Sequence, residues 1–504
     1  MGRYVLGVDQ STSGTTALIV DRGVRVLARG QAPVPRYRPR PGWVEQDPAE
    51  IWAATQRAMR LALQDARIPP DEIEAIGLSN QRETTVVWDR ETGEPVGRAI
   101  GWQDRRTQAL CDRLSAECGP EVEARTGQII LPNSAATKLH WLIENDRGVQ
   151  RLLAAGRLLY GTVDSWLLWN LTGGRTHATD CSNASVTLLL NAHTLAWDEP
   201  LLEWLGIPRA VLPQVRASAD PFGTTDPDRF FGERVPVAGM VGDQQAALLG
   251  QGGIRTGMAK NSYGSGAFLL MNLGQEFTPP SPGLFSPVLW AVDGAVSYGL
   301  EAMADVAGAA LRWLQEGLGL VRDSAEAAML AERVEDTGGV YFVPSFVGTG
   351  APHYDTLARG SMFGITERTT RGHIARAALE GMAYQTRDAV DLMRAGTTVP
   401  MDVLRADGGA ARSDFLLQFQ ADILGVPVER PQVMETAALG AAVLAGVQVG
   451  FWDSLEETAG HWTLGRRFEP RWPDSRRDAA YAGWLEAVER SAGWGATRPD
   501  RSAS

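Results

Sequence analysis

YVLGVDQSTSGTTALIVD, residues 4–21, places two apolar runs on either side of a polar turn. The first run ends at Asp9, and residues 11–17 are all small or hydroxylated. This pattern is typical of a β-hairpin, and VRVLARG at 24–30 extends it to a meander of three strands. Successive backbone N–H groups at such a turn can bind an anion. The turn is therefore either a plain connection or a phosphate site beside the Asp9 carboxylate.

Helices and strands alternate after this meander. PAEIWAATQRAMRLALQDA at 48–66 has proline in its first turn and apolar residues at helical spacing, so it predicts a helix whose N-cap is Asp47. IEAIGLS at 73–79 predicts a buried strand, and the alternation continues to about residue 250. The sequence therefore predicts an α/β protein rather than an all-β one.

The opening pattern returns near the middle of the chain. GMAKNSYGSGAFLLMNLG at 257–274 again contains a short run, a Gly/Ser turn and an apolar strand. The chain has 504 residues, more than the roughly 250–300 at which a single core stops growing. We predict two domains, residues 1–252 and 253–504, that face a central cleft.

Charge and composition limit the classes of partner. A net charge of −12 argues against nucleic acid or an anionic membrane surface as the main partner. The three cysteines form no CxxC pair and stand near no histidine cluster, so neither a disulfide framework nor a zinc site is expected. The N-terminus lacks a signal-peptide pattern, and the weakly polar stretch at 437–452 is too short to span a bilayer. We expect a cytoplasmic protein without membrane insertion.

The two common glycine-rich phosphate loops, GxxxxGK[ST] and GxGxxG after a strand, are both missing from the sequence. Hairpin turns are the remaining candidates: Thr12, Ser13 and Gly14 in the first, and Gly264, Ser265 and Gly266 in the second. Phosphoryl transfer also needs a cation on the phosphates and a group that accepts the proton of the attacking hydroxyl. Asp9 is a candidate Mg²⁺ ligand, because that ion prefers one or two carboxylates and keeps several waters.

Two further polar stretches follow apolar runs. In VGDQQAALLGQG (241–252), Asp243 is either the base or only the N-cap of the next helix, and the Gln244 amide can donate to and accept from a hydroxyl. In SNQRETT (79–85), the adjacent Arg82 and Glu83 suit a polyol, although a surface ion pair is the alternative. Lysine occurs only at positions 138 and 260, both beside such motifs. Trp102 is either an apolar wall of the site or a core residue.

The chain contains a series of long motifs, which are, in order along the sequence, PGWVEQDPAEIW, NQRETTVVWD, GTVDSWLLWNLTGGRTHATDCSNAS, GDQQAALLGQ, MAKNSYGSGAFLLMN, VGTGAPHYDTLARGSMFGIT, RADGGAARSDFLLQFQADIL and ERPQVMETAALGAAVLAG. Together they resemble the FGGY carbohydrate kinases, and within that family its glycerol-phosphorylating members. The resemblance runs from residue 4 to about 487, and residues 360–380 match the family's second signature.

The resemblance implies two actin-like, ribonuclease-H-type domains that flank a central ATP and substrate cleft. It implies Mg²⁺ and ATP-dependent phosphorylation of glycerol to sn-glycerol 3-phosphate, with Asp243 as general base and Asp9 and Asp243 as metal-associated carboxylates. The implied substrate contacts are Arg82, Glu83, Asp243, Gln244, Trp102, Asn133 and Phe268. The implied nucleotide contacts are Thr12, Ser13, Gly14, Thr16, Ser265, Gly308, Arg312, Gly409 and Ser413. A homo-oligomer, dimer or tetramer, stays open.

Four residues depart from the family pattern. Ser11 replaces a glycine, Thr16 an arginine, Asn133 a substrate-side tyrosine and Arg312 a nucleotide-side glutamine. The positive charge of Arg312 could replace that of the arginine for which Thr16 stands. Because Asn133 would widen the pocket, the first alternative is a kinase for another polyol or a ketose, such as a tetritol or pentulose. The second alternative is a non-catalytic actin-like ATP-binding protein.

Overall fold

The computed structural model describes residues 2–304 and 306–497. The predicted meander forms one side of a six-stranded sheet, whose strand order is β13-β14-β5-β1-β2-β3. These strands are β1 (Tyr4–Ser11), β2 (Gly14–Val20), β3 (Val26–Pro33), β5 (Ile73–Asn80), β13 (Ala219–Thr224) and β14 (Pro236–Gly242). β1 pairs antiparallel with β2 and parallel with β5. The polar turn at residues 12–13 therefore lies beside the ends of two parallel strands.

The second half of the chain repeats this arrangement in a seven-stranded sheet, with the order β17-β18-β16-β15-β21-β22-β23. Its strands are β15 (Ala259–Tyr263), β16 (Ala267–Gly274), β17 (Val288–Val292), β18 (Ala295–Ala304), β21 (Leu404–Asp407), β22 (Val428–Pro431) and β23 (Leu464–Phe468). β15 pairs antiparallel with β16 and parallel with β21, as β1 does with β2 and β5. The structure confirms the predicted α/β class and the predicted repetition of the hairpin in the second half of the chain.

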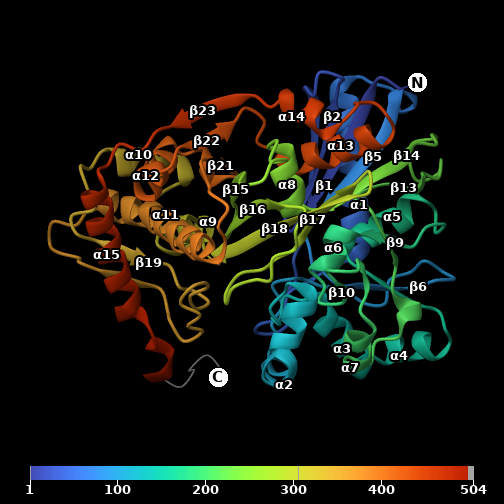
Figure 1. The fold of residues 1–504 in the computed structure, drawn as a ribbon, viewed down its shortest axis with the longest axis horizontal. Coiled ribbons are helices and arrows are strands. Elements are labelled where there is room, and N and C mark those ends of the chain that lie inside the picture. The colour runs from blue at the N-terminus through green and yellow to red at the C-terminus, as the bar shows by residue number, and fades with distance from the viewer. Residues whose placement is uncertain (1, 305, 498–504) are drawn as a thin grey trace.

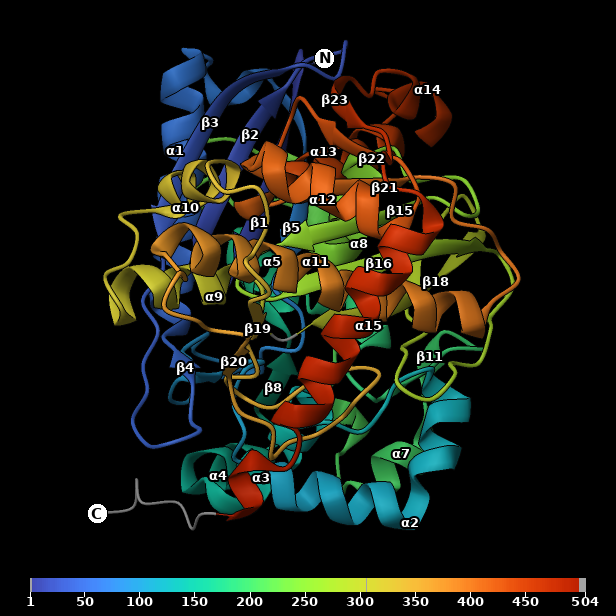
Figure 2. The ribbon, with the colours of Figure 1, turned by 90° about the vertical axis from the view of Figure 1, so that its left-hand side faces the viewer.

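Helices cover the two sheets. α1 (Pro48–Ala66) packs on β2 and β3, and α11 (Arg371–Gly396) packs on β16 and β18. The second half also contains the helices α9 (Gly308–Arg312), α10 (Ser324–Glu332), α12 (Asp414–Leu424), α14 (Leu455–Gly460) and α15 (Asp474–Ser491), as well as α13, described below. Its short strands β19 (Tyr341–Val343) and β20 (Ser361–Phe363) pair with each other. α15 runs along the outer edge of this half, far from the N-terminal sheet (Figures 1 and 2).

A mostly helical region lies below the first sheet, at the lower right of Figure 1. Its helices are α2 (Gln108–Thr126), α3 (Ala135–Asn145), α4 (Arg147–Ala154), α6 (Cys181–Ser185) and α7 (Glu199–Trp204). α5 (Val163–Leu171) packs instead on the first sheet, beside α1. The short strands of the region are β4 (Glu45–Gln46), β6 (Val86–Asp89), β7 (Ala99–Ile100), β8 (Leu158–Gly161), β9 (Ala178–Asp180), β10 (Leu190–Asn191), β11 (Ala196–Trp197) and β12 (Gln214–Arg216). Among the described residues, no helix is both long and apolar enough to cross a membrane.

One helix of the second half lies on the first sheet. α13 (Thr436–Gln448) packs against β1, β5, β14 and α8 (Asp243–Gly250), and Figure 1 shows it among the N-terminal strands. Glycines allow the close approach: a Cβ at Gly77 would lie 1.9 Å from the carbonyl oxygen of Ala441, and one at Gly7 would lie 2.1 Å from that of Ala438. The division at residues 252 and 253 falls between α8 and β15 and stays a prediction.

Candidate active site

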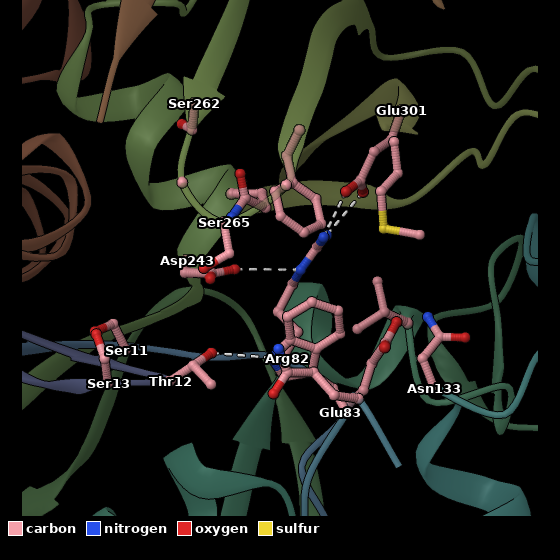
Figure 3. Close-up of a pocket in the computed structure, with 18 of the residues that line it drawn as sticks. Ser11, Thr12, Ser13, Arg82, Glu83, Asn133, Asp243, Ser262, Ser265 and Glu301 are labelled. Carbon is pink, nitrogen blue, oxygen red and sulfur yellow. Dashed lines mark hydrogen bonds and ion pairs between the residues drawn. The ribbon is translucent and has the colours of Figure 1, made fainter. Parts of the chain in front are cut away.

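A cavity of about 300 Å³ lies between the turns of the two hairpins, with walls from both sheets (Figure 3). It is lined by most of the predicted site residues: Thr12, Ser13, Arg82, Glu83, Trp102, Asn133, Asp243, Gln244, Ser265, Phe268 and Arg312. Segments that are far apart in the sequence therefore meet at one place, as expected for polar residues at the ends of adjacent strands.

Asp243 is not the N-cap of α8. Gly242 occupies that position, Asp243 is the first residue of the helix, and the cap makes no side-chain hydrogen bond. The Asp243 Oδ1 atom lies 3.3 Å from the Arg82 Nε atom but accepts no hydrogen bond among the described residues. Burial raises the pKa of Asp243, and the charges of Arg82 and Lys260 oppose that rise. The Asp243 carboxylate thus lines the cavity at a helix N-terminus that favours negative charge, with Arg82 as its charged neighbour.

Arg82 connects the two halves of the protein across the cleft. Its guanidinium forms a two-pronged ion pair with Glu301 of β18, in which Nη1 donates to Oε2 at 2.7 Å and Nη2 donates to Oε1. Both side chains are nearly buried, with 9% and 6% exposed. Sequence reasoning missed Glu301, whose only local signal is a carboxylate inside an apolar strand. Arg82 is therefore held in place between Glu301 and Asp243.

Glu83 has an unusual backbone that a buried lysine stabilises. Its φ of 66° is left-handed, a conformation that costs a non-glycine residue about 1–2 kcal/mol. The fully buried Lys138 donates from Nζ to the Glu83 carbonyl at 3.1 Å and also to the Asn133 carbonyl. Burial raises the pKa of the Glu83 carboxyl group, and the neighbouring charges of Arg82 and Lys138 oppose that rise. Lys138 therefore fixes two segments of the cavity wall relative to each other.

The second lysine supports the opposite wall. Lys260 is fully buried on β15, and its Nζ donates to the Gln244 Oε1 atom, to Ser262 Oγ at 3.0 Å and to the Phe268 carbonyl at 3.2 Å. Burial lowers the pKa of Lys260 to about 8. Sequence reasoning noted both lysines as rare but gave neither a role. Rarity within an arginine-rich chain was the signal that could have found them.

The first hairpin turn offers hydroxyl groups to the cavity. Trp102 Nε1 donates to Thr12 Oγ1 at 2.9 Å, and Ser11 Oγ donates to the Gly14 carbonyl at 2.9 Å. Ser11 is the last residue of β1 and has no left-handed backbone, so serine fits there without strain. Thr16 does not line the cavity: its Oγ1 accepts a hydrogen bond from Gln31 of the neighbouring strand at 3.1 Å.

The second turn is covered by α9. The Gly308 N–H donates to the Gly264 carbonyl at 3.0 Å, and a Cβ at Gly308 would lie 2.6 Å from that oxygen. Gly308 thus supports the turn and does not line the cavity itself. Arg312 lies with its Nη2 3.5 Å from Ser265 Oγ. Arg36 also lines the cavity, and sequence reasoning missed it.

Gly409 and Ser413 lie at a different cavity of about 360 Å³ on the second half of the protein. Leu311 lines this second cavity, whereas the adjacent Arg312 lines the first. α9 therefore separates the two cavities and contributes to both. The Ser413 hydroxyl is engaged as the N-cap of α12, where it accepts from the Leu416 N–H at 3.1 Å.

Asp9 lies near the end of β1, two residues before Ser11, and is not among the residues that line the cavity. Ser79 Oγ donates to its Oδ1 at 3.0 Å. Burial raises the pKa of Asp9 to about 7, and the negative charge of Asp243 adds to the rise. No cluster of three or more His, Cys, Asp or Glu side chains is placed to hold a metal within residues 2–304 and 306–497. A cation here would rely on these two carboxylates and on oxygens from outside the protein.

Comparison with known proteins finds similar chains and family models. The family model for the N-terminal domain of the FGGY family of carbohydrate kinases matches residues 4–250, and the one for the C-terminal domain matches residues 259–449. The chain is 50% identical to glycerol kinase 2 of Thermotoga maritima over 98% of this chain and 99% of that one. It is 46% identical to the glycerol kinase of Thermus thermophilus over 97% and 99%.

Solved structures show the same fold. The crystal structure of Plasmodium falciparum glycerol kinase with ADP superposes with a TM-score of 0.89 at 34% identity, over 97% of this chain and 98% of that one. A ligand-bound xylulose kinase from Lactobacillus acidophilus superposes with a TM-score of 0.84 at 22% identity, over 98% and 100%, and supports the fold alone.

Proposed function

Because the chain belongs to the FGGY family of carbohydrate kinases, we propose that it transfers the terminal phosphoryl group of ATP to glycerol, giving sn-glycerol 3-phosphate. The observation that carries the proposal is the Asp243 carboxylate, which lines one cavity with the two hairpin turns and the adjacent Arg82 and Glu83. Its Oδ1 atom accepts no hydrogen bond among the described residues. The relatives named glycerol kinase support the choice of polyol. The expectations of a cytoplasmic location and of a dimer or tetramer stay predictions.

The polyol would lie in the cavity beside Asp243. Its hydroxyl groups can accept hydrogen bonds from Arg82 and donate to Glu83, because a hydroxyl does both. Trp102 and Phe268 meet edge to face with ring centroids 6.0 Å apart, so they can form the apolar wall for the carbon chain. A site that pairs each hydroxyl with a polar group rejects analogues that lack one.

Asp243 would accept the proton of the terminal hydroxyl as its oxygen attacks the γ-phosphorus atom in line. The new O–P bond forms as the bond to the β-phosphate oxygen breaks, so ADP leaves. Thr12 and Ser13 in the first turn and Ser265 in the second can donate hydrogen bonds to the phosphoryl oxygens, and Arg312 adds a positive charge. The nucleotide would extend over α9 toward Gly409 and Ser413.

Mg²⁺ fits the two carboxylates at this place. The negative charge of Asp243 raises the pKa of Asp9, and the Asp243 Oδ1 atom accepts no hydrogen bond among the described residues. A cation held by these carboxylates would offset both the repulsion and the missing hydrogen bond. When bound, the ion would neutralise phosphate charge during transfer. Asp9, Asp243, phosphate oxygens and waters would hold it.

Replacement of the base tests the proposal. Asp243→Asn should lower kcat about 10²–10⁴-fold, measured as ADP release at saturating glycerol, and should leave ADP affinity nearly unchanged by calorimetry. Asp65→Asn, at an exposed position of α1, is the matched control and should keep wild-type kcat. Wild-type turnover by Asp243→Asn would show that Asp243 is not the base.

A further inference from the structure

Three buried glutamines join segments that are far apart in the sequence, next to the first hairpin turn. Gln10 lies in β1, Gln46 in β4 and Gln81 directly after β5, and each is at most 1% exposed. The Gln81 Nε2 atom donates to Gln10 Oε1 at 2.9 Å and to Gln46 Oε1 at 2.8 Å, so both of its amide protons are used. Buried amides are unfavourable unless they are paired in this way. The three side chains therefore specify one arrangement of the segments that carry them.

The two outer glutamines hold the backbone of the hairpin turn. Gln10 Nε2 donates to the Ser11 carbonyl at 2.7 Å, and Gln46 Nε2 donates to the Thr12 carbonyl at 3.0 Å. In a trans peptide, a carbonyl and the N–H of the next residue point in opposite directions. The N–H groups of Thr12 and Ser13 therefore point away from the glutamines, and both residues line the cavity. Consecutive N–H groups of this kind can bind an anion.

The central glutamine is also connected to the apolar wall of the cavity. The fully buried Thr84 hydroxyl donates to Gln81 Oε1 at 3.1 Å and accepts from the backbone N–H of Trp102 at 3.3 Å. The Trp102 side chain donates from Nε1 to Thr12 Oγ1 at 2.9 Å. These hydrogen bonds close a ring, whose members are Thr12, Gln46, Gln81, Thr84 and Trp102.

The ring joins the two sides of the proposed reaction. Thr12 belongs to the turn that faces the phosphoryl group in that reaction, and Trp102 belongs to the wall for the polyol. In-line transfer requires the attacking oxygen and the phosphorus atom to be aligned, and a displacement of about 1 Å can lower the rate roughly 10²-fold. The ring resists such a displacement, because each broken hydrogen bond would leave a buried polar group unpaired.

We propose that Gln81 and Thr84 are positioning residues, which hold the polyol wall at Trp102 and the phosphate turn at Thr12 at the separation that in-line transfer requires. The proposal rests on the proposed function. Neither Gln81 nor Thr84 lines the cavity, so both act through Thr12 and Trp102 and not by contact with a substrate.

The test compares two threonine variants of the full-length enzyme that lose the same kind of group. Thr84→Val keeps the shape of the side chain and removes both hydroxyl hydrogen bonds. Thr172→Val is the matched control: Thr172 is 1% exposed, donates to the Leu168 carbonyl at 2.8 Å, accepts from the Thr176 N–H at 3.2 Å and does not line the cavity. Both variants should lose similar thermal stability.

Only Thr84→Val should lower kcat with glycerol, by about 10-fold or more, and its KM values for glycerol and ATP should change less than its kcat. Equal kcat values for Thr84→Val and Thr172→Val, in an enzyme whose wild type phosphorylates glycerol, would overturn the positioning role and leave the proposed function standing. Absence of turnover by the wild type would instead overturn the proposed function.

A second break tests whether the ring acts as a unit. Gln46→Met opens it on the side of the phosphate turn and should also lower kcat; it gives the reading if Thr84→Val does not fold, as judged by circular dichroism. Because either change alone opens the ring, the double variant Thr84→Val/Gln46→Met should lose clearly less than the product of the two single losses in kcat. Losses that multiply, or a kcat that neither variant lowers, would overturn the proposal.

Discussion

Replacement of Gly77 with alanine tests how closely α13 lies on the first sheet. The new Cβ would lie 1.9 Å from the carbonyl oxygen of Ala441 and 2.4 Å from its carbonyl carbon, whereas ordinary contact begins at 3.4 Å. The helix would therefore have to retreat by about 1.5 Å, the difference between 1.9 and 3.4 Å. A retreat would also separate Ala438 from Gly7 on the neighbouring strand. Overpacking of this kind costs about 1–3 kcal/mol, and we expect the upper end because backbone meets the added carbon.

The assay is thermal unfolding by scanning calorimetry. A loss of about 3 kcal/mol should lower Tm by roughly 6–12 °C, since about 2–4 °C correspond to each kcal/mol in a large domain. Gly460→Ala is the matched control, because that glycine is exposed at the end of α14 and a Cβ there meets no heavy atom within 4 Å. If Gly77→Ala melts at the same temperature as Gly460→Ala, α13 does not lie at the distance that this reasoning requires.

Three further predictions concern charge. Burial lowers the pKa of His177 from 6.5 to about 4. As pH falls, the unfolded chain therefore binds the proton before the folded chain does, and the stability present above pH 6.5 is lost as pH falls toward 4. His177→Phe should reduce the drop in the free energy of unfolding between pH 7 and pH 5 by about 2 kcal/mol, and an undiminished drop in urea titrations would contradict this. Glu301→Gln leaves Arg82 to pair with Asp243 alone and so lowers the pKa of that carboxyl group; the acid limb of the kcat profile should move to lower pH, and a limb at the wild-type pH would argue against the pairing. Arg312→Gln should raise KM for ATP about 10-fold with little change in KM for glycerol, and equal effects on both constants in initial-rate measurements would remove Arg312 from the nucleotide side.

Local signals in the sequence were sufficient for single elements. α1 begins at Pro48 and ends at Ala66, as predicted, and the Asp47 side chain accepts from the Ala49 N–H at 2.8 Å. Proline geometry, cap chemistry and helical spacing all act within a few residues, so they can be read without knowledge of the fold. Motifs at strand ends also predicted most of the residues that line the main cavity, because the ends of adjacent strands meet in space.

Contacts between distant segments could not be predicted in this way. The ion pair of Arg82 with Glu301 spans 219 positions, and no local pattern around Glu301 names its partner. Thr16 was expected near the nucleotide, yet it bonds Gln31 across β2 and β3, and its role stays a prediction. The sequence around Thr16 predicted that this residue lies in a strand, but it did not predict the direction of the side chain.

The placement of α13 links the first sheet to the order in which the chain is synthesised. All six strands of that sheet lie within residues 4–242, but the helix that covers one face begins at Thr436, about 190 residues later. At translation rates of about 5–20 residues per second, the interval is roughly 10–40 s. Throughout it, the apolar face that includes Val5, Ala75 and Ala238 has no cover from α13. The nascent N-terminal half therefore exposes this apolar face until α13 has been synthesised, and exposed surface of this kind favours aggregation.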